Sequence, residues 1–119
     1  MTHETGMPPL HLIADAKCDG VLDDPALVAR FVEEAVLVTG LTIRHLHVQQ
    51  FDNGSKFGPG VSAIALLGES GMMVHTAPER RTINVDLFSC RAFPTLPIHD
   101  LMVQAFKATE FDRWITLER

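Results

Sequence analysis

The segment LLGESGMMVHTAPE, residues 66–79, joins two apolar runs through a Gly-Glu-Ser-Gly tetrad. The runs cover residues 61–67 and 72–76, and their short, glycine-containing link is typical of a β-hairpin. Asn-Gly is the ordinary choice at such a turn. Glu69 and Ser70 at the tip are therefore unusual, and the hairpin raises the question of what this pair does.

A helix is predicted upstream of the hairpin. Asp24 supplies an acidic N-cap and Pro25 occupies the first helical position. Apolar residues then recur at helical spacing from Leu27 to Val38, and Gly40 provides a C-terminal stop. A second apolar stripe predicts another helix over residues 98–108.

Strand patterns fill most of the remaining chain. They cover residues 10–18, 41–51, 61–67, 72–76, 81–90 and 111–117. The element order is β-α-β-β-β-β-α-β, with short links between consecutive strands. This order predicts an α+β fold, a two-layer sandwich in which two helices pack on one face of a mostly antiparallel sheet.

Length and composition indicate a single folded domain over residues 1–119, with 46% hydrophobic residues. The net charge of −5 disfavours nucleic acid and anionic membranes as partners. The uncharged part of the central region is too short to span a bilayer. Two cysteines without a CxxC pair, and no signal-peptide pattern at the first residues, predict a reduced, cytoplasmic protein.

Two chemical readings come from the polar residues taken alone. His45 and His47 lie two apart on a predicted strand and share a face, so they could bind a metal together with His75 or Cys90. Ser70, His75 and Asp86 could form a hydrolase triad, although no G-x-S-x-G elbow surrounds the serine. Strand histidines and turn serines are more often structural, so neither reading is favoured and no metal is expected.

Three motifs follow one another in order: Glu69-Ser70, then His75-Thr76-x-Pro78-Glu79, then VDLFSC at residues 85–90. Together they resemble the small bacterial and archaeal S-adenosylmethionine decarboxylases. Segments 11–15, 22–25 and 60–62 extend the similarity upstream, so that it covers roughly residues 10–110. The combination is far more specific than any one dipeptide.

The resemblance implies a cofactor made from the chain itself. Decarboxylation of an α-amino acid needs an electron sink, and no lysine-centred pyridoxal phosphate site is visible. The family cleaves its own backbone between the equivalents of Glu69 and Ser70. This implies a β chain, residues 1–69, and an α chain, residues 70–119, that begins with a pyruvoyl group. The substrate amine then forms a Schiff base with the ketone, and the product feeds spermidine synthesis.

The resemblance also implies roles for particular side chains. His75 matches the histidine that assists self-cleavage, Ser62 matches a serine that supports processing and proton placement, and Cys90 matches the proton donor. Glu79 matches the glutamate that binds the ribose hydroxyls. The family's site forms within a homodimer, so a dimer is implied. Gly68 and Gly71 are expected to permit a strained turn at the cleavage site.

The sequence departs from the family pattern near the substrate. Ala77 stands where the family has a tryptophan expected to cover the adenine ring, and residues 80–84 and the loop 52–60 also differ. Phe57 in that loop is a candidate substitute ring. The alternatives are therefore a relative that decarboxylates a free amino acid such as arginine or ornithine, or an unprocessed regulatory paralogue.

Overall fold

A computed structural model describes residues 8–119 of the chain, which fold into one six-stranded sheet with the order β2-β3-β4-β5-β1-β6. All five neighbouring pairs are antiparallel. The strands are β1 (Leu10–Cys18), β2 (Ile43–Phe51), β3 (Gly60–Leu67), β4 (Ser70–Ala77), β5 (Thr82–Ser89) and β6 (Ala108–Glu118). A 3₁₀ turn, η1 (Pro78–Arg80), links β4 to β5.

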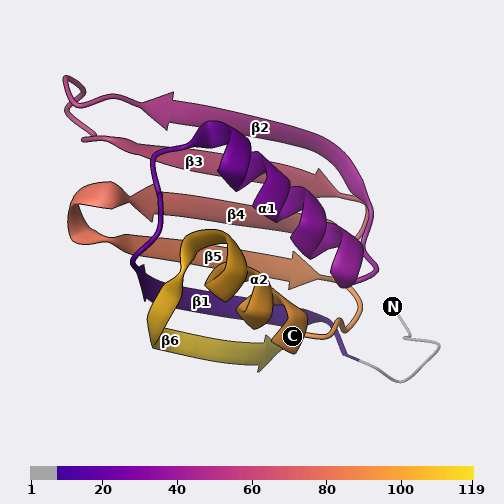
Figure 1. Cartoon of the computed structure of the whole chain (residues 1–119). Helices are drawn as coiled ribbons and strands as arrows, with labels where there is room; N and C mark the ends of the chain where they lie inside the picture. Colours follow the sequence, from indigo (N-terminus) through magenta and orange to yellow (C-terminus); the bar gives the residue numbers. More distant parts are fainter. Residues whose placement is uncertain (1–7) are drawn as a thin grey trace.

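Helices α1 (Pro25–Val38) and α2 (Leu96–Phe106) cover one face of the sheet (Figure 1). Asp24 caps α1 because its carboxylate accepts the backbone N–H groups of Ala26 and Leu27 at 3.0 and 3.3 Å. The two helices meet through an edge-to-face pair, Phe31 and Phe106, whose ring centroids are 5.1 Å apart. The predicted two-layer α+β sandwich is confirmed.

Alternation along the strands separates the buried helix-facing side of the sheet from its other side. On β4, for example, Met72, Val74 and Thr76 are buried under the helices. We call the other side the open face, because no element among residues 8–119 covers it. Its exposed apolar side chains include Ile64, Leu66 and Met73, which are 56%, 59% and 47% exposed.

Three local expectations are wrong. Helix α2 ends at Phe106 rather than at residue 108, because Lys107 adopts a left-handed cap (φ 54°) and the next residue joins β6. Ser70 is the first residue of β4 and does not lie in the turn. Neither Gly68 nor Gly71 has a positive φ, so the expected glycine-based strain is absent there.

None of the helices within residues 8–119 has the length and apolar character needed to cross a membrane.

Candidate active site

The predicted cleavage bond lies in the β3–β4 connection, which is held against the end of β5. Ser70 pairs with Ser89 across the β4–β5 ladder. The next residue along, Cys90, donates its backbone N–H to the Glu69 carbonyl oxygen at 3.0 Å. A backbone donor therefore already points at the carbonyl that a Ser70 hydroxyl attack would turn into an oxyanion.

The Glu69 side chain is also held by hydrogen bonds. Its carboxylate accepts the Thr42 backbone N–H at 2.9 Å and the Thr42 hydroxyl at 3.3 Å. The Arg91 guanidinium donates to the same carboxylate at 3.4 Å and to the Gly40 carbonyl at 3.3 Å. The Glu69 side chain is only 14% exposed, so these donors satisfy a largely desolvated charge.

Ser62 and His75 form a second group of predicted residues. They are cross-strand partners on β3 and β4, and the Ser62 Oγ lies 2.8 Å from the His75 Nδ1. This pair lies on the open face, whereas Ser70 has the helix-facing parity of β4. Five positions of extended strand correspond to about 16 Å. Within one chain, the structure therefore does not bring His75 to Ser70.

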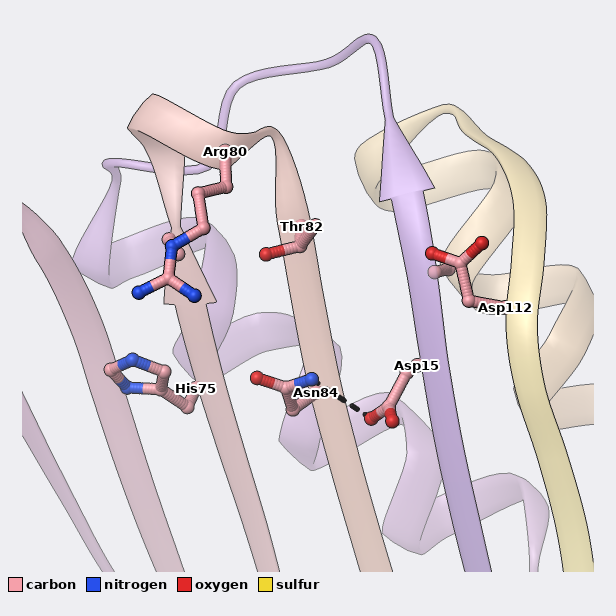
Figure 2. Close-up of a pocket in the computed structure, with 8 residues that line it drawn as sticks. Asp15, His75, Arg80, Thr82, Asn84 and Asp112 are labelled. Atoms are coloured by element: carbon pink, nitrogen blue, oxygen red, sulfur yellow. Dashed lines mark hydrogen bonds between the residues drawn. The ribbon is translucent and has the colours of Figure 1, made fainter.

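A polar cavity of about 330 Å³ opens beside His75 on the open face (Figure 2). Arg80 and His75 line one side of it, and the carboxylates of Asp15 and Asp112 line the other. The Asn84 side-chain amide, between them, donates to Asp15 at 2.8 Å. The cavity thus offers both a cationic and an anionic wall to a small polar ligand.

Glu79 lies close to the same end of β4, in η1. It lines a hollow of about 90 Å³ with Phe57, Ala77 and Arg80. Phe57 is 68% exposed and packs edge-to-face on Phe51, with ring centroids 5.7 Å apart. The loop that carries Phe57 therefore brings an aromatic ring to the same hollow as Ala77, the position at which the family pattern has a tryptophan.

The two alternative chemistries find no support in the geometry. His45 and His47 do share the open face of β2, opposite Leu66 and Ile64, but no group of three metal-binding side chains forms within residues 8–119. Asp86 lies 2.8 Å from His11 rather than beside His75. The separation of Ser70 from His75 excludes the triad within one chain.

The threonine of the His-Thr-x-Pro-Glu motif has a structural role that sequence reasoning missed. Thr76 is fully buried, and its hydroxyl donates to the Leu22 carbonyl at 2.7 Å and accepts the Val61 N–H at 2.9 Å. In the sequence, the one signal for this role is that Thr76 continues the alternation of Met72 and Val74 along β4. Thr42 and Arg91 were also missed, because nothing in their local sequence indicates contact with residue 69.

The sequence is similar to known S-adenosylmethionine decarboxylases. The family model described as S-adenosylmethionine decarboxylase matches residues 10–115. An S-adenosylmethionine decarboxylase proenzyme of Sulfurisphaera tokodaii is 31% identical over 82% of this chain and 80% of its own length. The one of Caldanaerobacter subterraneus is 32% identical over 67% of this chain, and the match spans only 62% of that relative.

The fold gives the same result. The crystal structure of the adenosylmethionine decarboxylase from Aquifex aeolicus superimposes with a TM-score of 0.78 and 25% sequence identity. The superposition covers 95% of this chain and 91% of that one. The order of the motifs, the architecture and the family match agree, and the chain belongs to the S-adenosylmethionine decarboxylase family.

Proposed function

We propose that the chain is a self-processing decarboxylase that removes the carboxyl group of S-adenosylmethionine. The observation that carries the proposal is the Cys90 N–H donated to the Glu69 carbonyl, next to the hydroxyl-bearing Ser70. Cleavage of the 69–70 bond leaves a β chain, residues 1–69, and an α chain, residues 70–119.

The bonds formed and broken balance in each processing step. The Ser70 hydroxyl adds to the Glu69 carbonyl carbon and loses its proton, and the C–N bond breaks as the nitrogen takes up a proton, which leaves an ester. Loss of the Ser70 Cα proton and cleavage of the Cβ–O ester bond give a dehydroalanine and release the main-chain carboxylate of residue 69, which becomes the C-terminus of the β chain. Water then replaces the dehydroalanine nitrogen, which leaves as ammonia. The resulting ketone at residue 70 supplies the electron sink that decarboxylation requires.

The two groups of site residues support a dimer. Glu69, Ser70 and Cys90 lie at one end of β4, whereas Ser62, His75 and Glu79 lie at the other. A second copy stacked on the open face with its β4 reversed brings its His75 end over the first copy's Ser70 end. A two-fold interface repeats this contact at both ends of β4, and because the Ser70 side chain has helix-facing parity, it is the backbone at residue 70 that the partner's His75 approaches. The exposed apolar side chains of the open face supply the surface that such a contact buries.

The proposed substrate site lies at the end of β4 that carries His75 and Glu79. In the proposed dimer, Glu79 binds the ribose hydroxyls and Phe57 stacks on the adenine ring in place of the family tryptophan. Stacking of a base on an aromatic side chain contributes about 1–3 kcal/mol. Phe57→Ala is expected to raise KM about tenfold or more while cleavage of the chain is unaffected.

An intact-mass measurement tests the proposed processing. The purified chain should appear as two fragments rather than one of 13.2 kDa, and borohydride should trap the substrate amine on the α fragment. Release of labelled carbon dioxide then tests the substrate. A permanently intact chain indicates the regulatory alternative, and release only from arginine or ornithine indicates a different decarboxylase.

A further inference from the structure

We infer that Thr42 and Arg91 form a clamp on the Glu69 side chain that positions the scissile carbonyl for self-cleavage. The inference rests on the proposed self-processing and adds two positioning residues to it. Neither belongs to the motifs that carry the family resemblance. We call the three residues, Thr42, Glu69 and Arg91, the carboxylate clamp.

The clamp ties the turn to elements on either side of it. The Gly68 N–H donates to the Thr42 carbonyl at 2.8 Å, in addition to the two Thr42 bonds to the carboxylate. Arg91, which follows β5, connects the same carboxylate to the Gly40 carbonyl after α1. Together with the Cys90 N–H, these contacts fix residue 69 from both its side chain and its backbone.

Such fixation matters because the attack is intramolecular. Ser70 must reach the carbonyl carbon of the residue directly before it, and a well-oriented intramolecular attack gains its rate from a restricted geometry. The turn contains only Gly68 and Glu69, and neither glycine beside the bond supplies strain through a positive φ. The clamp and the Cys90 N–H are thus the contacts of this segment that restrict the carbonyl's position.

The charge of Arg91 has a second effect. The attack places negative charge on the Glu69 carbonyl oxygen, close to the carboxylate of the same residue, and like charges oppose one another. The guanidinium neutralises that carboxylate and leaves the Cys90 N–H to stabilise the oxyanion. Arg91 is itself 61% exposed, and partly exposed ion pairs contribute little to stability. Its removal should therefore affect the cleavage rate rather than the fold.

Newly synthesised full-length chain offers a direct test. The fraction of intact chain is followed by mass against time for Glu69→Ala and Arg91→Met, with Arg30→Met on the outer surface of α1 as the matched control for charge. We expect cleavage to slow about 10- to 100-fold in the first two and to remain unchanged in the control. Arg91→Lys, which retains a cationic donor, should restore most of the rate lost in Arg91→Met, and Thr42→Ser, which retains the hydroxyl, should cleave at close to the wild-type rate.

Hydroxylamine cleaves esters. It therefore distinguishes a variant that forms the ester slowly from one that forms the ester but fails in the later elimination. His75→Ala should accumulate the ester and split on its addition, whereas Glu69→Ala should stay whole because the acyl shift itself is slow. Thermal unfolding identifies any variant that is merely misfolded, and Glu69→Gln, which retains the shape, should cleave faster than Glu69→Ala. Wild-type rates in the clamp variants, or rapid splitting of Glu69→Ala by hydroxylamine, would overturn the clamp. An uncleaved wild-type chain would instead refute the proposed function.

Discussion

At the scale of single residues, Cys90 presents two chemically separate groups at the site. Its backbone N–H contacts the Glu69 carbonyl, whereas its thiol is the proposed proton donor. Cys90 continues the open-face parity of β5, so the thiol belongs to the side on which a partner's His75 would lie. A change of side chain therefore separates the effects of the two groups, because it leaves the backbone donor in place.

We expect Cys90→Ala to cleave normally but to lose about a hundredfold or more in kcat, since general acid catalysis contributes on this order. Fragment masses and carbon dioxide release measure the two effects in one preparation. The companion variant Cys90→Pro also lacks the backbone N–H, and we expect it to slow cleavage of the 69–70 bond. Full turnover by Cys90→Ala would mean that another group donates the proton.

The second cysteine differs in its environment. Cys18 is 1% exposed, and burial raises the pKa of its thiol to about 11. Because the unfolded thiol loses its proton at lower pH than the folded one, the contribution of Cys18 to stability should fall as the pH rises from about 9 towards 11. Below pH 9, a thiol reagent should modify Cys90 in the folded chain and Cys18 only in denaturant. Equal labelling of both in the folded chain would contradict this burial.

At the scale of elements, the start of β3 is fixed by close approach to β4. Gly60 has a φ of 153°, and a Cβ there would lie 2.5 Å from the Thr76 carbonyl oxygen. The buried Thr76 hydroxyl holds the same two strands and the loop before α1 together. This packing orients Ser62 and His75, which lie within two positions of Gly60 and Thr76 on the same two strands.

Gly60→Ala should therefore destabilise the precursor by about 2–4 kcal/mol, since the backbone contact cannot relax without moving a strand. Denaturant unfolding of the Ser70→Ala background, which stays uncleaved, measures the loss. Gly54→Ala is the matched control, because its Cβ would meet one side-chain oxygen at an ordinary 3.7 Å. Equal stability of the two variants would show that the strands can separate at little cost.

Local signals in the sequence predicted most elements, because caps and alternation are properties of neighbouring residues. The Asp24-Pro25 start and the alternation of β5 are examples. Long-range arrangement was not predictable in this way: Ala108 favours a helix locally, yet it pairs with Cys18 in the sheet. The separation of Ser70 from His75 could have been found, since an odd spacing on one strand places two side chains on opposite faces.

At the scale of the whole molecule, the proposed dimer shares its sites between copies. If Ser70 of one copy works with His75 of the other, a mixed dimer of Ser70→Ala and His75→Ala chains contains one fully native site. That site includes the serine of the His75→Ala chain. We expect this chain to be cleaved when the two variants are co-expressed and to remain whole when it is produced alone.

The masses of differently tagged chains provide the readout. The control is a mixture of Ser70→Ala with Glu69→Ala chains. The Glu69→Ala defect lies beside the serine of the same chain, so the partner cannot compensate for it. Cleavage of His75→Ala alone would show that the histidine is dispensable. A co-expressed His75→Ala chain that never splits would place both residues in one copy and exclude the shared site.

The strand order determines how the proposed cleavage of the 69–70 bond affects the folded protein. The 69–70 bond assigns β1, α1, β2 and β3 to one piece and β4, β5, α2 and β6 to the other, while β1 is inserted between β5 and β6. The pieces are interlocked, because β1 cannot leave without breaking a ladder on each of its sides. The severed protein should therefore elute as a single species in native buffer and come apart only in denaturant.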